Sequence, residues 1–138
     1  MKNIIKNSGF LLLLAVLFSG CEEKIELTNR DYFIATYSVT ETWVENGNTI
    51  TKAPFTMYVT LSYINEDGIL LSNFANYGAG VTAESTKNGF NMTIKQQTLP
   101  NLKVITGTGK LDDPTLNFTY TETFNSISTS ITAVAKKK

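Results

Sequence analysis

The run Phe55-Thr56-Met57-Tyr58-Val59-Thr60-Leu61-Ser62-Tyr63 decides the fold, because apolar and hydroxyl-bearing residues alternate along it. Every second residue, from Phe55 to Tyr63, falls on one face of an extended chain, and the residues between them fall on the other. Side chains of a strand alternate between the two faces of a sheet, so this period of two predicts a strand with one buried and one solvated face. Such strands are typical of antiparallel sheets.

The same alternation recurs on the C-terminal side, in Phe90–Lys95 and Leu116–Thr121. Asn46-Gly47, Asp67-Gly68 and Asn88-Gly89 favour type I′ hairpin turns, because these dipeptides accept positive φ. Four further breaks, where glycine, proline, asparagine, aspartate and serine gather, lie at 77–80, 100–101, 112–114 and 125–126. Seven turns predict eight strands.

We place the eight strands at 32–44, 49–64, 69–75, 80–86, 90–97, 102–111, 115–123 and 127–135. Short strands joined by tight turns form an antiparallel meander, and pairing the last strand with the first removes two open edges that invite aggregation. We therefore predict an all-β, eight-stranded, lipocalin-like barrel, with a two-sheet β-sandwich as the alternative. Pro54 predicts a bulge or bend within the second strand. Gly107 and Gly109 share one strand face and indicate either strand curvature or the close approach of a ligand.

The first twenty residues have the features of a removable signal peptide. Lys2 and Lys6 precede the unbroken apolar run Phe10–Phe18. This run has the length of a signal-peptide core, whereas a membrane-spanning helix needs about 20 apolar residues. We therefore exclude residues 1–20 from the folded domain.

Cys21 is the only cysteine of the chain, and the small residues Ser19 and Gly20 precede it. This pattern resembles the lipobox of bacterial lipoproteins, which implies a mature protein held to a membrane by acyl chains on Cys21. Glu22-Glu23-Lys24 resembles the surface-export signal of Bacteroidota lipoproteins, which implies an outer-membrane location facing outward. We divide the chain into a signal peptide at 1–20, the lipidated cysteine with a polar tether at 21–31, and a β-barrel domain at 32–138.

Composition excludes several classes of function. The chain has no histidine and no cysteine besides Cys21, which removes the common zinc sites and both Cys–His and Ser–His catalysis. Without residues 1–20, ten basic side chains face twelve acidic ones, and Lys136–Lys138 is the only basic cluster. Nucleic-acid binding requires a basic surface. We therefore expect no metal, no cofactor, no nucleic-acid partner and no enzymatic activity.

Four segments combine strand periodicity with a few glycines: Ala35–Val39, Leu71–Phe74, Phe90–Ile94 and Ile105–Gly109. Together they resemble small Bacteroidota lipoproteins with a lipocalin-like barrel, across most of the mature chain. The resemblance implies a barrel domain at the cell envelope but no particular activity.

Five residues are candidates for ligand contact: Tyr37, Glu41, Trp43, Tyr77 and Glu122. Glu41 and Glu122 interrupt apolar strand faces, where a carboxylate is costly unless it is paired or solvated. The first and seventh strands flank the eighth in a closed barrel. The two acids therefore either line a barrel mouth and bind the polar end of a ligand, or lie near solvated strand ends; a glycosidase-like pair is a third interpretation. Tyr77 lies in a glycine-rich loop of the kind that often carries binding.

Two functions remain open from the sequence. A lipid-anchored barrel can hold a small apolar or amphipathic ligand at the cell envelope, since eight strands leave room for side chains or one small ligand. Alternatively, the domain is a structural or interaction subunit of an envelope protein complex and has no ligand pocket. We favour the binding module and expect the membrane, through Cys21, as its first partner.

Overall fold

The computed structural model describes residues 30–138, which form an all-β domain with two short 3₁₀ helices, η2 (Asp31–Phe33) and η3 (Phe74–Asn76). The strands are β1 (Ala35–Glu45), β2 (Asn48–Thr51), β3 (Phe55–Leu61), β4 (Gly68–Ser72), β5 (Thr82–Asn88), β6 (Asn91–Thr98), β7 (Val104–Asp112), β8 (Thr115–Phe124) and β9 (Ile127–Lys137).

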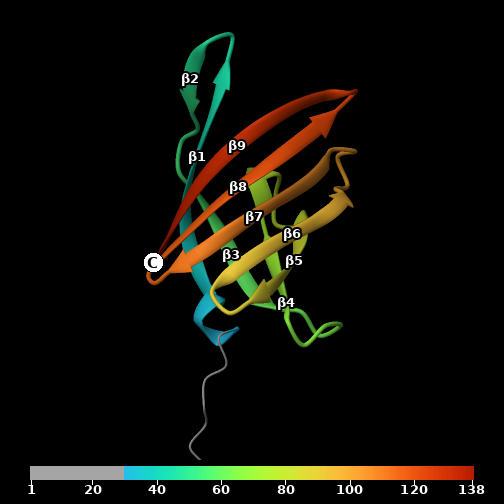
Figure 1. The fold of residues 1–138 in the computed structure, drawn as a ribbon. Coiled ribbons are helices and arrows are strands. Elements are labelled where there is room, and N and C mark those ends of the chain that lie inside the picture. The colour runs from blue at the N-terminus through green and yellow to red at the C-terminus, as the bar shows by residue number, and fades with distance from the viewer. Residues whose placement is uncertain (1–29) are drawn as a thin grey trace, which may run out of the picture.

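Eight of these strands make a closed antiparallel barrel in the order β1-β3-β4-β5-β6-β7-β8-β9, and β1 pairs with β9 to complete it (Figure 1). The predicted eight-stranded meander barrel is confirmed, and the two-sheet alternative is not formed. Because β1 and β8 both pair with β9, the predicted arrangement of the first and seventh strands around the eighth is also confirmed.

The predicted second strand, 49–64, is wrong in one respect, because the structure divides it at Lys52–Pro54 into β2 and β3. Proline lacks the backbone N–H that a ladder needs, so the chain leaves the sheet where we predicted only a bulge or bend. Both pieces pair with the same edge of β1, β2 with its C-terminal half and β3 with its N-terminal half. The short β2 is therefore a ninth strand that extends the β1–β2 hairpin beyond the barrel wall (Figure 1).

The turn prediction holds at Asn46-Gly47, where φ is +50° and +80°. It fails at Asp67-Gly68, because β4 begins at Gly68 and the connection from β3 is a longer loop. A Cβ on Gly68 would lie 2.6 Å from the Ser62 Cβ, so this glycine serves a close backbone approach rather than positive φ. The longer loop also removes Tyr63 from the strand, and its side chain is 97% exposed instead of buried.

Side chains of all eight barrel strands alternate between the interior and solvent. The interior is apolar and is built mainly by Tyr37, Val39, Met57, Val59, Ile69, Leu71, Ala83, Met92, Ile94, Ile105, Leu116, Phe118, Tyr120, Ala133 and Ala135. Phe33 from η2 and Phe74 from η3 are also fully buried. On the opposite face of the decisive run, Tyr58 and Thr60 are exposed as predicted and Thr56 is half-buried. Ser62, which lies just beyond β3, is buried instead.

Gly107 and Gly109 make room for large side chains of the neighbouring strand. They face Tyr120 and Phe118 across the β7–β8 pair. A Cβ on Gly107 would lie 2.5 Å from the Thr119 carbonyl oxygen, and one on Gly109 would lie 2.6 Å from the Phe118 Cβ. The glycines therefore allow the two strands to coil closely around aromatic residues of the core, which supports the curvature interpretation.

The signal peptide at 1–20, the lipidation of Cys21 and most of the polar tether lie outside the described residues. Within residues 30–138, the structure contains no helix with the length and hydropathy to cross a bilayer.

Candidate functional site

Glu41 is a buried carboxylate at the centre of β1. Its side chain is on the interior face and the residue is only 2% exposed. The Tyr120 hydroxyl from β8 donates a 2.8 Å hydrogen bond to Glu41 Oε1, and Lys52 Nζ donates a 3.4 Å bond to Oε2. Solvation near a strand end therefore does not explain this acid; it is stabilised by a tyrosine and a lysine that the barrel brings to it.

Glu122 on β8 has a second pair of partners. Lys103 Nζ, from the chain just before β7, donates 2.6 Å hydrogen bonds to Glu122 Oε1 and to the Tyr77 hydroxyl oxygen. The Tyr77 hydroxyl in turn donates to Glu122 Oε2. The Glu122 side chain is 13% exposed, so this trio lies at the barrel rim, closer to solvent than Glu41.

The η3 segment places Tyr77 over the barrel. Asn73, Ala75 and Asn76 all have positive φ, which is unusual for residues other than glycine. The Asn73 side chain holds this conformation by donating a 2.6 Å bond to the Thr56 carbonyl, and Lys52 Nζ donates a 2.6 Å bond to the Ala75 carbonyl. Since Phe74 and Ala75 are buried, η3 forms a cap that closes one end of the barrel.

The Tyr77 ring connects the two carboxylate sites. Lys52 Nζ lies 5.5 Å from the ring centroid and Lys103 Nζ lies 4.6 Å from it, within the range of cation–π attraction. We call the six residues around this ring the mouth cluster: Glu41, Lys52, Tyr77, Lys103, Tyr120 and Glu122. Every member of the mouth cluster has a partner within the cluster. The direct effect of the cluster is therefore to connect the η3 cap to the barrel wall.

Burial sets the protonation of the mouth cluster. It raises the pKa of the Glu41 carboxyl, against hydrogen bonds from Tyr120 and Lys52 that lower this pKa. Burial and the nearby Glu41 charge raise the pKa of Tyr120, while burial and the bond to Glu122 raise the pKa of Tyr77 to about 12. Burial lowers the pKa of Lys103, but its bonds to Glu122 and Tyr77 outweigh this and leave the pKa raised. Both tyrosines therefore stay protonated at neutral pH and act as donors.

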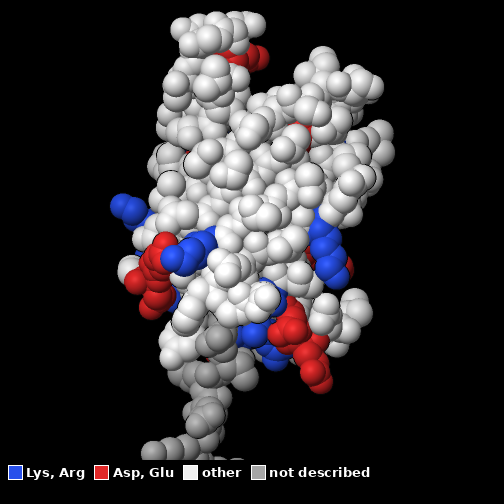
Figure 2. Space-filling view, in the orientation of Figure 1, with Lys and Arg blue, Asp and Glu red and all other residues white. Residues whose placement is uncertain are grey.

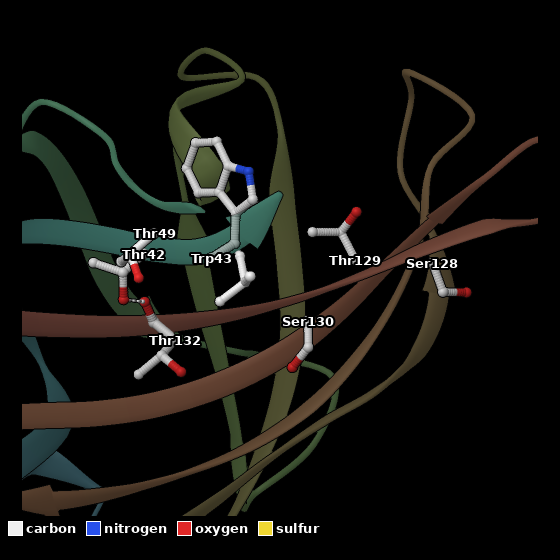
Figure 3. Close-up of a pocket in the computed structure, with 8 residues that line it drawn as sticks. Thr42, Trp43, Thr49, Ser128, Thr129, Ser130 and Thr132 are labelled. Carbon is white, nitrogen blue, oxygen red and sulfur yellow. Dashed lines mark hydrogen bonds between the residues drawn. The ribbon is translucent and has the colours of Figure 1, made fainter. Parts of the chain in front are cut away.

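Trp43 lies on a different feature, a groove of about 390 Å³ between the ends of two hairpins (Figure 3). The groove is lined by Thr42, Trp43, Val44, Thr49, Ser128, Thr129, Ser130 and Thr132, none of which carries a charge. Trp43 is half-buried and shares a strand face with Glu41, two residues further into the barrel. Thr129 faces Glu122 across the β8–β9 pair, so the groove adjoins the mouth cluster.

The groove exists because β1 and β9 separate. Their pairing ends at Trp43 and Ile131. Beyond that point β1 continues with β2 to Glu45, and β9 continues with β8 to Ile127. The β1–β2 and β8–β9 hairpins therefore diverge (Figure 1), and we call the space between them the fork.

Of the five predicted contact residues, the structure brings Glu41, Tyr77 and Glu122 together, with Trp43 beside them. Tyr37 does not join this group, because it is fully buried and its hydroxyl donates a 3.0 Å bond to the Phe33 carbonyl. Burial, with a smaller effect of Asp113, raises the Tyr37 pKa.

The sequence analysis missed Lys52, Lys103 and Tyr120. Tyr120 is one of a run of alternating aromatic residues, and its only polar signal was a hydroxyl on an apolar face that must find a partner when buried. Lys52 precedes the strand break at Pro54, and Lys103 follows the turn at Pro100-Asn101. Each of these lysines lies in a connection between two strands. Their positions in these connections were the signal that could have identified them as partners for Glu41 and Glu122.

The outer wall carries a second feature, a row of threonines that are paired in register across six strands. The row consists of Thr93, Thr108, Thr119, Thr132, Thr42 and Thr51, on β6, β7, β8, β9, β1 and β2. Charged side chains are scarce at the end of the molecule from which the hairpins project (Figure 2). Interface cores are depleted of charge, so this hydroxyl-rich wall has a composition suited to contact with a partner.

Comparison of the sequence with known protein families and with characterised proteins finds no match. In the described part of the chain, no group of three or more His, Cys, Asp or Glu side chains is placed to hold a metal ion.

Proposed function

We propose that this protein is a lipid-anchored lipoprotein of the cell envelope that binds a small amphipathic ligand in the fork without catalysing a reaction. The observation that carries the proposal is the uncharged groove of about 390 Å³ beside the half-buried Trp43. Its size lies within the usual range for ligand sites, roughly 300–1,000 Å³. The indole offers an apolar face and the surrounding serines and threonines offer hydroxyl donors and acceptors.

The mouth cluster supports a non-catalytic role. Glu41 and Glu122 each accept hydrogen bonds from one tyrosine and one lysine, so both carboxylates are occupied by the cap. Core side chains from all eight strands meet inside the barrel, which favours a ligand at the mouth over one along the barrel axis.

Trp43 makes the binding proposal directly measurable, because it is the only tryptophan of the chain. Native mass spectrometry of the protein purified from its membrane is expected to retain a small molecule. Trp43→Ala is expected to lose it, whereas Tyr58→Ala, which removes an exposed aromatic of β3, is expected to keep it. Retention by Trp43→Ala at the wild-type level would exclude the groove as the binding site.

The anchor is tested separately at Cys21. In cells fed an alkyne-labelled fatty acid, the wild-type protein is expected to carry the label, and Cys21→Ala is expected to lose both label and membrane association. Protease accessibility of the wild-type protein on intact cells then tests the proposed outward-facing location on the outer membrane. An unlabelled wild-type protein would contradict the anchor and leave the groove proposal unaffected.

The second candidate is an interaction subunit of an envelope complex, favoured by the uncharged threonine wall. Thr108→Lys and Thr119→Lys place charge in that wall at exposed positions, and neither residue lines the groove. If the wall is an interface, a protein crosslinked to the wild type in intact cells is lost from both variants. The small molecule bound at Trp43 is then retained.

A further inference from the structure

We propose that the end of the barrel opposite the fork is a membrane-contact surface, on which the anchored domain stands with the fork facing away from the bilayer. This inference rests on the proposed anchor at Cys21 and goes beyond the binding function. The surface is formed by η2, the β3–β4 loop and the β5–β6 turn, which lie at the end of the barrel where β1 begins (Figure 1). We call this end the base.

The β3–β4 loop of the base presents two adjacent apolar side chains to solvent. Tyr63 is 97% exposed and Ile64 is 90% exposed. The Ser62 N–H donates a 3.0 Å bond to the Gly68 carbonyl, and the Gly68 N–H donates a 2.8 Å bond to the Asn65 carbonyl, so hydrogen bonds hold the shape of the loop. Apolar groups are stabilised when they leave water, so an apolar pair displayed by a hydrogen-bonded loop indicates a surface that covers it.

Further apolar side chains of the base come from η2 and the β5–β6 turn. The Arg30 guanidinium donates a hydrogen bond to the Glu66 carbonyl, which joins the residue before η2 to the β3–β4 loop. The Tyr32 ring contacts Phe90 edge to face, with 5.8 Å between the ring centroids. Tyr32, Ile34 and Phe90 are all at least 36% exposed. Tyrosine suits a membrane–water interface, because its ring is apolar and its hydroxyl is polar.

The length of the tether makes the anchoring bilayer the surface that the base meets. Arg30 follows Cys21 by nine residues, so even a fully extended tether holds the base within about 30 Å of the anchor. β1 runs from the base to the fork over 11 residues, a length of about 35 Å. The apolar side chains exposed at the fork end, such as Val44 and Ile127, are therefore a strand length further from the anchor.

The charges of the base favour an apolar contact over an electrostatic one. Its segments contain one basic residue, Arg30, and three acidic ones, Asp31, Glu66 and Asp67. Lys87 offsets Asp67 through a 3.2 Å ion pair. Because the base has no positive excess to attract anionic headgroups, the strength of the contact depends on the apolar area that it buries.

The contact is expected to be weak by itself and effective only together with the anchor. A tether of this length gives the base an effective concentration at the bilayer on the order of millimolar. A contact too weak to retain the free domain can therefore keep the tethered domain docked. This agrees with the expected loss of membrane association in Cys21→Ala.

The test reproduces the tether chemically, so it does not depend on acylation in cells. Since Cys21 is the only cysteine, the full mature chain can be coupled through its thiol to a maleimide-bearing lipid in phosphatidylcholine vesicles. Brominated phosphatidylcholine in these vesicles quenches a tryptophan that enters the bilayer. Two reporter variants carry Trp43→Phe; one adds Tyr63→Trp at the base, and the other adds Phe124→Trp at the fork end. Only the base reporter is expected to lose fluorescence, at low and at high salt alike.

The apolar character of the contact is tested by adding Ile64→Asp to the base reporter. A carboxylate is costly in an apolar environment, so the docked population is expected to fall about tenfold relative to the undocked one. The matched control adds Ile127→Asp, which replaces an isoleucine that is 72% exposed at the fork end, and is expected to leave the quenching unchanged. Both positions are exposed, so both variants are expected to fold.

Three results would overturn the inference. If neither reporter is quenched, the domain does not touch the bilayer, and a protein crosslinked at Tyr63 in intact cells would then be the partner of the base. Equal quenching of both reporters means that the barrel lies on its side. Quenching that disappears at high salt means that charged headgroups, rather than apolar side chains, make the contact. A wild-type protein without fatty-acid label in cells contradicts the anchor alone, because the chemically tethered measurement still decides whether the base docks.

Discussion

Replacement of Tyr120 by phenylalanine tests the buried part of the mouth cluster. The substitution keeps the ring in the core and removes only the hydroxyl that donates a 2.8 Å bond to Glu41. Glu41 is 2% exposed, and its remaining donor is Lys52 at 3.4 Å, so water does not readily replace the lost bond. A hydrogen bond to a charged group stabilises a protein by about 1.5–3 kcal/mol, and one to a neutral group by about 1 kcal/mol. We expect a loss of about 2 kcal/mol when Glu41 is ionised.

The loss depends on pH in a definite direction. Burial raises the Glu41 pKa above its unfolded value, so the folded state holds this proton more tightly than the unfolded state does. The resulting stabilisation is complete below the unfolded pKa and is lost as the pH rises through the folded pKa. The Tyr120 hydroxyl lowers the Glu41 pKa, so Tyr120→Phe raises that pKa further. The variant therefore loses more stability than the wild type between low and neutral pH. Tyr120→Phe is therefore expected to be more destabilising at pH 7 than at pH 4.

Urea unfolding at both pH values, followed by circular dichroism, measures this difference. The control is Tyr58→Phe, which removes a hydroxyl from an exposed ring on the outer face of β3 and is expected to change stability by less than about 0.5 kcal/mol. At pH 7 the loss in Tyr120→Phe corresponds to a fall in Tm of roughly 8 °C, at about 4 °C per kcal/mol. Equal stability of Tyr120→Phe and the wild type at both pH values would refute the proposed role of this hydroxyl.

Two further predictions concern the core and the cap. Gly107→Ala places a Cβ 2.5 Å from a backbone carbonyl of β8 and is expected to destabilise the fold by about 1–3 kcal/mol in urea unfolding, whereas Gly80→Ala, which meets no atom within 4 Å, is expected to have little effect. Lys103→Met removes a partner of Glu122, whose side chain is 13% exposed, and is expected to cost about 1 kcal/mol and to speed amide hydrogen exchange in η3. Lys110→Met breaks an ion pair whose two side chains are about 60% exposed, so neither quantity is expected to change.

The strands were predictable because their signals are local. Alternation around Met57 and around Phe118 depends only on neighbouring residues, and a turn such as Asn46-Gly47 needs only two residues that accept positive φ. Apart from the division at Pro54, the predicted boundaries agree with the structure to within three residues. Closure of the barrel followed from the same signals, since an even number of antiparallel strands allows the first and last to pair.

The site was only partly predictable. Glu41, Tyr77, Trp43 and Glu122 stood out as polar or aromatic residues on strand faces and in a glycine-rich loop. Tyr37 stood out for the same reason, yet its hydroxyl is satisfied by a local carbonyl of η2. A polar group on an apolar face shows that a partner is required but does not say which residue provides it.

The sequence by itself determined the period of the strands, the position of most turns and the composition that excludes histidine- and cysteine-based chemistry. Tertiary structure decided which residues meet. Tyr120 contacts Glu41 across 79 residues of chain, and Tyr77 reaches Glu122 across 45. Such contacts depend on the register accumulated around the whole barrel, and the fork depends on where β1 and β9 stop pairing. Neither quantity is encoded in any short stretch of sequence, because both result from the closure of the sheet.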